Sequence, residues 1–259
     1  LSANTFKGDT DKLDTQTSLG LSLQDQINLT NKLDIRLGAR LDDYQQTLNN
    51  RRTNKVSRYS KNQISPQLGL VYKAAEAYSL YAVYGENFRP LTGADDENNL
   101  EPNQSSSTEV GVKFTLNNGA LEGTFALFDV EQSNISIVDA DVNPTAIGSA
   151  ASQGVEWDIH GKLTDNMNIW LSYAYTDAAT KNAFNDPNFG NELPAGSRLL
   201  NIPKQQLSLQ FVHNRPLAGK PFTMIGGLVY VDERNGFFSD QTFKLPVTLR
   251  FEWPPITMY

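Results

Sequence analysis

A long-range alternation of apolar and polar residues, with a period of two, constrains the fold most. Residues 19–24 alternate leucine with Gly, Ser and Gln, and residues 33–42 alternate apolar side chains with Asp, Gly and Arg. Successive side chains of a β-strand point to opposite faces, so this pattern predicts strands with one apolar face. The same alternation predicts strands at Ile64–Tyr72, Val110–Leu116, Val155–Ile159, Ile169–Tyr175, Leu207–Phe211 and Phe243–Trp253.

Three further segments are apolar or aromatic at both odd and even positions. They are Tyr78–Phe88, Leu121–Val130 and Phe222–Val231. With them, the sequence predicts about eleven strands and no amphipathic helix, which indicates an all-β fold.

The connections between these strands alternate between short and long. Short turns are predicted near 31–32, 74–77, 117–119, 164–166 and 215–220, and long polar loops near 49–62, 91–106, 139–149 and 177–201. The short turns recur about every 43 to 52 residues, which is the period of a hairpin with two long strands.

Soluble all-β folds fit this spacing poorly. A propeller places four short strands in each period of about 40 to 50 residues, and a sandwich places a strand about every 8 to 12 residues. Here a strand occurs about every 23 residues, and the long loops lie on one side. Short turns at one end and long loops at the other are typical of an outer-membrane barrel. We therefore predict one domain over residues 1–259, an antiparallel transmembrane β-barrel with short periplasmic turns and long extracellular loops.

Composition excludes several classes of function. The 22 Lys and Arg against 29 Asp and Glu give a net charge of −7, which argues against a nucleic-acid partner. There is no cysteine and there are two histidines, His160 and His213, so a metal centre or a His-based enzyme is not expected. No apolar run reaches the ~18 residues of a membrane-spanning helix.

One segment, Tyr78–Pro90 (YSLYAVYGENFRP), resembles the strand-and-loop signature in the barrel of TonB-dependent ferric-siderophore receptors. Flanking segments resemble family segments in the same order along most of the chain. They are Leu23–Ile27, Leu37–Asp42, Ile64–Tyr72, Leu100–Pro102, Glu109–Lys113, Ala126–Val130, Gln153–Glu156 and Leu171–Asp177.

The resemblance implies a receptor of the bacterial outer membrane. Such a protein binds a ferric siderophore, imports it with energy from the TonB complex, and performs no catalysis. It also implies a barrel domain of roughly 22 strands, of which residues 1–259 would be the C-terminal portion. An N-terminal plug domain, absent from this chain, and contact with outer-membrane lipid and lipopolysaccharide are implied as well. Eleven strands cannot close such a barrel, so we expect more chain, or a second copy, to complete it.

The C-terminal end departs from the family pattern. Phe243–Pro246 resembles a segment that other strands normally follow, whereas Val247–Trp253 resembles a terminal strand. This raises the question of residues missing between Pro246 and Val247.

Aromatic and arginine side chains at the predicted mouth are the candidate ligand contacts. Arginine supplies charge for an anionic chelate, and aromatic rings supply contact area. The candidates are Tyr84, Phe88, Arg89, Tyr175, Phe184 and Phe189. An alternative, which we favour, is that the aromatics form the interfacial girdle and that Arg89 pairs with lipid phosphate or a neighbouring acid.

Two other polar clusters have simpler interpretations. Asp95, Asp96, Glu97 and Glu101 match no defined calcium loop and indicate a solvated acidic loop. Glu156, Asp158, His160 and Lys162 share one strand face, which is typical of a polar barrel lumen rather than of acid–base catalysis. A porin-like or adhesin barrel, and a soluble all-β binding module, remain the alternative functions.

Overall fold

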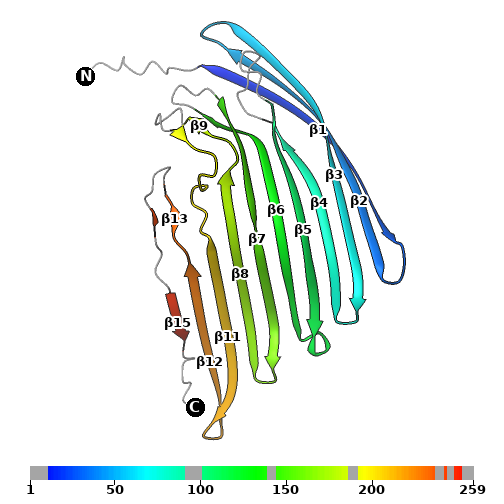
Figure 1. The fold of residues 1–259 in the computed structure, drawn as a ribbon, viewed down its shortest axis with the longest axis vertical. Helices are drawn as coiled ribbons and strands as arrows, with labels where there is room; N and C mark the ends of the chain where they lie inside the picture. Colours follow the sequence, from blue (N-terminus) through cyan, green and yellow to red (C-terminus); the bar gives the residue numbers. More distant parts are fainter. Residues whose placement is uncertain are drawn as a thin grey trace, which may run out of the picture.

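The computed structural model of the chain describes residues 11–90, 101–138, 144–185, 192–236, 242–243 and 248–252. Its main element is a single antiparallel sheet of eleven strands, each hydrogen-bonded to the next (Figure 1). The strands are β1 (Lys12–Asn28), β2 (Leu33–Asn50), β3 (Lys55–Ala75), β4 (Tyr78–Arg89), β5 (Asn103–Leu116), β6 (Leu121–Val138), β7 (Pro144–Thr164), β8 (Met167–Thr180), β11 (Gln205–Leu217), β12 (Lys220–Val231) and β15 (Thr248–Glu252). The predicted all-β antiparallel architecture is confirmed.

Three small elements complete the described structure. β9 (Phe184–Asn185) pairs with β10 (Glu192–Leu193), and β13 (Arg234–Asn235) pairs with β14 (Thr242–Phe243). A 3-10 turn, Asn117–Gly119, joins β5 to β6. Among the described residues, no helix has the length and hydropathy needed to cross a membrane.

Tight turns join the strands at the lower end of Figure 1. Between β11 and β12 the turn residues Ala218 and Gly219 have φ angles of 51° and 75°. Positive φ at both central residues is the backbone geometry that matches the twist of two hairpin strands. The predicted short connections are therefore present, and they all lie at one end of the sheet.

Several predicted boundaries are wrong, including those of the loops predicted at 91–106 and 139–149, because β5 begins at Asn103 and β7 at Pro144. The connection predicted at 49–62 is a four-residue turn, 51–54, because β2 and β3 continue as a paired hairpin up to Asn50 and Lys55. The connection predicted at 177–201 contains β9 and β10. The single strand predicted at Phe243–Trp253 is divided into β14, which pairs with β13, and β15, which pairs with β12.

The register separates the side chains into two chemically distinct faces. Residues that pair directly across an antiparallel ladder share a face. Four apolar residues of the alternating segments lie together on one face, which we call the apolar face, and their sequence neighbours lie on the opposite, polar face. The apolar four are Leu37, Leu68, Val112 and Leu171; the polar four are Arg36, Gln67, Lys113 and Ser172.

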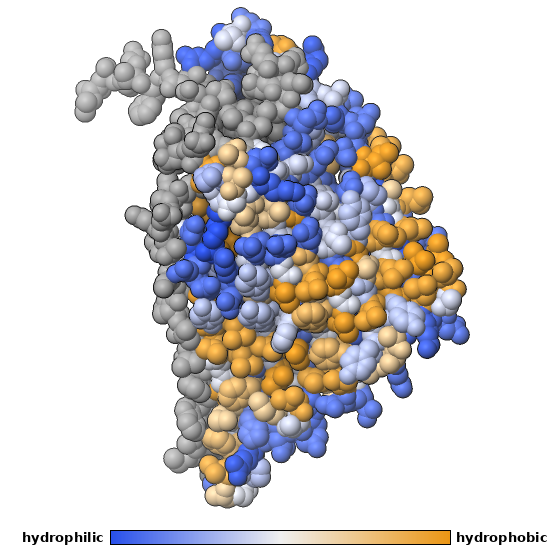
Figure 2. Space-filling model, viewed as in Figure 1, coloured by the Kyte–Doolittle hydropathy of each residue, from blue (hydrophilic) through white to orange (hydrophobic). Residues whose placement is uncertain are grey.

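No second layer covers the apolar face among the described residues, and its large side chains are exposed. Leu23 is 80% exposed on the edge strand, and Leu80 and Leu127 are each 45% exposed within the sheet. Figure 2 shows a continuous apolar band across the strands, bordered by polar residues at both ends. Lipid, rather than a protein core, fits such a surface.

The buried positions of the sheet lie mainly on the polar face. Asp42, Gln46 and Ser65 are 3–7% exposed although, in the part of the chain that the structure describes, no other sheet or helix packs on them. Side chains crowd one another in this way on the inner side of a curved sheet, as they do in the lumen of a barrel.

Candidate functional site

The polar face carries a series of charged and hydrogen-bonded pairs, which make it the candidate functional surface. On β2 and β3, Arg40 forms a salt bridge of 2.8 Å with Asp42, and Lys73 forms one of 2.9 Å with Asp34. Arg36 donates to Gln24 of β1. Arg40 and Lys73 are thus paired with acids within the sheet, whereas Arg36 contacts a neutral amide oxygen.

Further along the polar face, β4 and β5 are joined by an aromatic and two charged residues. The Tyr81 hydroxyl donates to the carboxylate of Glu109, and the Lys113 ammonium lies 5.2 Å from the centre of the Tyr81 ring. Gly111 lies between them on β5, and a Cβ there would lie 2.7 Å from the Tyr81 ring. A glycine is therefore required for the ring to lie flat across the strand.

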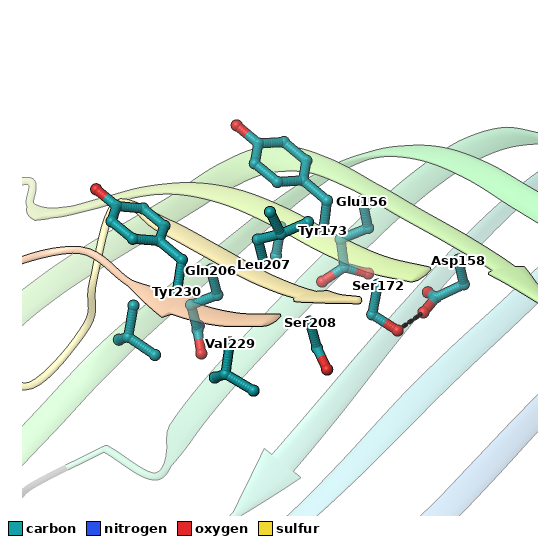
Figure 3. A pocket seen from close by; sticks show the side chains of 11 residues that line it. Glu156, Asp158, Ser172, Tyr173, Gln206, Leu207, Ser208, Val229 and Tyr230 are labelled. Carbon is teal, nitrogen blue, oxygen red and sulfur yellow. Dashed lines mark hydrogen bonds between the residues drawn. The ribbon is translucent and has the colours of Figure 1, made fainter. Parts of the chain in front are cut away.

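A hollow of about 340 Å³ lies on the same face over β7, β8, β11 and β12. Figure 3 shows Glu156, Asp158 and Ser172 projecting to one side of the strands, whereas Tyr173 and Tyr230 project to the other. The Ser172 hydroxyl donates to Asp158 at 2.7 Å. The polar-face lining of the hollow therefore combines two acids and two serines with Val229 and Val231.

At the loop end, the start of β5 is held to its neighbours. Lys61 of β3 donates to Glu101 at 2.6 Å, and Pro102 is fully buried. Gln132 donates to Asn103 at 2.8 Å, and Asn134 donates to the Pro102 carbonyl at 3.0 Å. Asn134 has φ 54° beside a β-bulge between β6 and β7, a conformation that Asn tolerates.

The β2–β3 hairpin extends beyond the apolar band. On β2, its apolar-face residues past Leu41 are polar, beginning with Asp43 and Gln45. On the opposite face Tyr44, 3% exposed, donates to Gln46 at 3.2 Å. Burial raises the pKa of Tyr44 to about 12, and the nearby Asp14 carboxylate adds to the rise.

The register divides the predicted ligand contacts between the two faces. Arg89 pairs with Asn103 on the polar face. Tyr84, Phe88 and Tyr175 are at alternate strand positions that lie on the apolar face. These four side chains are therefore not brought together in one site. Phe184 begins β9 at the loop end, and Phe189 lies outside the described residues, as do Asp95, Asp96 and Glu97. The ligand-binding role of these residues stays a prediction.

The set Glu156, Asp158, His160 and Lys162 lies along the polar face of β7, as predicted for a barrel lumen. His160 lies 3.7 Å from Glu122 of β6, whereas Asp158 accepts a hydrogen bond from Ser172 of β8. Among the described residues, no group of three or more His, Asp and Glu side chains is arranged to hold a metal ion.

Sequence reasoning did not single out Tyr81, Gln132 or Asn134. Gln132 could have been found as a polar residue at a position that the alternation assigns to the polar face. The bulge that positions Asn134 has no local sequence signal. Tyr81 lies in a segment that is apolar at both parities, so its face depends on the register with β5.

Comparison with known proteins identifies the family. The model of the TonB dependent receptor-like β-barrel matches residues 2–256. The chain belongs to this family. Its members are transport receptors of the outer membrane of Gram-negative bacteria.

Among its relatives is the metal-pseudopaline receptor of Pseudomonas aeruginosa, 33% identical over 240 residues, which cover 88% of this chain and 33% of that protein. The ferrioxamine B receptor of Salmonella typhimurium is 29% identical over 234 residues, covering 88% of this chain and 32% of that protein. The siderophore receptor PiuA of Acinetobacter baumannii has the same fold, with a TM-score of 0.75 at 23% identity over 93% of this chain and 36% of that one. The chain thus spans about a third of the length of these proteins.

Proposed function

We propose that this chain forms part of the barrel wall of a receptor that binds a ferric siderophore, or a similar metal chelate, and imports it. The observation that carries the proposal is the sheet itself. Its eleven strands present one apolar and one polar face, in a chain whose relatives are named as siderophore and metal-chelate receptors. A passive channel or an adhesin would account for the two faces but not for these relatives.

The remainder of such a receptor lies outside the sheet described here. The outer edge of β1 has no partner strand among the described residues. In lipid, each unpaired backbone group of that edge would cost several kcal/mol, so further strands, or a second copy, must pair with it. We infer a plug domain inside the closed barrel, which the TonB complex engages from the periplasm. No chemical step on the chelate is required.

Within the chain, we propose Arg89 as a contact to the chelate. It lies on the polar face at the loop end of β4, where a ligand arriving from outside would meet the lumen. The guanidinium group suits carboxylate, hydroxamate or catecholate oxygens because it offers several donors in one plane.

Uptake of radioactive iron tests the import function. Cells lacking the full-length gene should lose uptake of one iron chelate from a panel of hydroxamate, catecholate and carboxylate siderophores, and the gene should restore it. The restored uptake should stop when the proton gradient is collapsed, because active import needs energy. Uptake that persists without the gradient would identify a passive channel and contradict the proposal.

A further inference from the structure

The loop end of β4 is paired on one side only. Its last pair with β3 is Gly85 with Gln67, whereas its pairing with β5 continues to Arg89, which lies opposite Asn103. Arg89 is exposed, and its side chain has no hydrogen-bond or ion-pair partner among the described residues. The Arg89–Asn103 pair is therefore a terminal rung held from β5, and the last rung of a ladder opens most easily unless other contacts tie it down.

On the far side of β5, side chains take over from the backbone ladder. The pairing of β5 with β6 begins at Gln104, so Asn103 lies outside it. The Gln132 amide donates to the side-chain oxygen of Asn103 at 2.8 Å, and the Asn103 amide donates to the backbone carbonyl of Asn134 at 3.5 Å. The Asn134 amide donates in turn to the Pro102 carbonyl at 3.0 Å. We call Asn103, Gln132 and Asn134 the amide clamp.

Burial makes the amide clamp effective. Pro102 is fully buried and Asn103 is 5% exposed, so water competes little for these hydrogen bonds. Without the Asn134 amide, the Pro102 carbonyl would be a buried acceptor with no partner, which is costly. Asn134 has a φ of 54°, in the left-handed region that Asn adopts more readily than most residues. The clamp therefore fixes the Asn103 side of the terminal rung.

The other contact at this strand end is weaker. The ammonium of Lys61 lies 2.6 Å from the carboxylate of Glu101, but both side chains are partly exposed. Water screens such a pair, so it contributes little to holding the strand. It also acts at Glu101, two residues before Asn103, and so it leaves the terminal rung itself to the amide clamp.

We propose that the amide clamp positions Arg89 for contact with the imported chelate. The inference rests on the proposed function, in which Arg89 is the contact, and it gives the three clamp residues a positioning role without contact to the chelate. With the clamp closed, the rung holds Arg89 on the polar face at the mouth of the lumen. When the clamp is lost, the rung is open for part of the time, and the apparent affinity decreases in proportion to the fraction that stays closed.

Two substitutions open the clamp, and a third is the matched control. Asn134→Gly removes the amide that binds Pro102 and supplies a residue that accepts positive φ. Gln132→Met removes the donor to Asn103 with a side chain of similar length. Asn118→Gly is the control, because Asn118 has the same φ of 54° and lies in the exposed turn at the opposite end of β5 and β6.

Spin labelling measures the rung directly and needs no chelate. The chain has no cysteine, so Arg89→Cys places one nitroxide label at the terminal rung of the full-length receptor, with any cysteine outside this chain replaced by serine. Electron paramagnetic resonance gives the ratio of mobile to immobile label. Asn134→Gly and Gln132→Met should each raise this ratio about fivefold, the factor that corresponds to one net hydrogen bond. Asn118→Gly should leave it unchanged. An unchanged ratio in both clamp variants would overturn the inference, as would an equal rise in the control.

Chelate binding tests the functional consequence. The probe is the siderophore of the uptake panel that the wild-type gene imports, loaded with ferric iron and titrated against the full-length receptor. Both clamp variants should weaken binding by up to about fivefold, and they should cause no further loss when combined with Arg89→Ala. An equal further loss in that background would show that the clamp supports the barrel in general, which overturns the inference. Unchanged affinity in Arg89→Ala alone would contradict the proposed chelate contact and end the functional role of the clamp, whereas the spin-label ratio decides separately whether the clamp holds the rung.

Discussion

Placing an arginine at Leu171 tests directly whether the apolar face meets lipid. Leu171 is the middle of five successive apolar-face residues on β8, from Met167 to Tyr175, and it pairs with Ile159 of β7 and Leu209 of β11. An arginine at the centre of the lipid-facing band costs about 2–4 kcal/mol. That range corresponds to a decrease of roughly thirtyfold to several hundredfold in the ratio of folded to unfolded protein.

The matched variant is Ser172→Arg, one residue further along β8. Ser172 faces the opposite side, between Asp158 and Ser208, so its arginine would meet water and a carboxylate. We expect a change within about 0.5 kcal/mol there. Equilibrium unfolding of the full-length receptor in lipid vesicles by urea, followed by tryptophan fluorescence, measures both. Equal effects of the two variants, or a cost below about 1 kcal/mol at Leu171, would refute the assignment of the faces.

Three further outcomes follow from individual contacts. Gly111→Ala should lower the free energy of unfolding by about 1–3 kcal/mol, measured in the same unfolding assay, because its Cβ would lie 2.5 Å from the Phe125 carbonyl oxygen. The second outcome concerns Tyr44. The tyrosinate absorbance of wild type minus that of Tyr44→Phe, followed as the pH rises, should have its midpoint near pH 12 rather than 10. Because this pKa is raised on folding, the stabilisation that it reflects is complete below pH 10 and is lost as the pH rises through 12; a midpoint near 10 would contradict the burial of the phenol. Arg89→Ala should weaken chelate binding about tenfold or more in a ligand titration of the full-length receptor, since a hydrogen bond to a charged group contributes roughly 1.5–3 kcal/mol, and unchanged affinity would place the site elsewhere.

The arrangement of strands was predictable because lipid and water impose opposite requirements on alternate residues. Leu37 and Leu68 stand opposite each other across β2 and β3, as their parity in the sequence requires. One exception to the apolar–polar alternation is Asp25. It shares the apolar face with Leu37 but lies on the edge strand β1. A carboxylate on the lipid face costs less than an arginine or lysine there, and an edge position leaves room for a partner from the next strand.

The loop end was less predictable, because above the membrane both faces of a strand meet water. Residues 43–62 lose the alternation for this reason, and 49–62 were predicted as a loop, although backbone pairing continues to Asn50 and Lys55. The face of Tyr84 was not predictable either, since Tyr78–Phe88 is apolar at both parities. Its direction follows from pairing with Leu68 and Thr108, which sequence periodicity does not determine.

The positions of the β-bulges show how strongly the membrane fixes the register. The described pairs contain register irregularities at Lys73–Ala75, at Gln132–Ser136 and at Lys162–Thr164. The first and third lie beside short turns, and the second lies at the loop end, so none interrupts the rungs of the apolar band. A one-residue slip inside the band would move Lys113 to the lipid side at a cost of about 2–4 kcal/mol and turn Val112 into the lumen. At the strand ends both sides are wet, so a slip costs little, and it is there that a bulge directs Asn134 toward Pro102 and fixes the start of β5. The lipid therefore determines the wall of the barrel, and the freedom to vary its shape is confined to the mouth, where a receptor needs it.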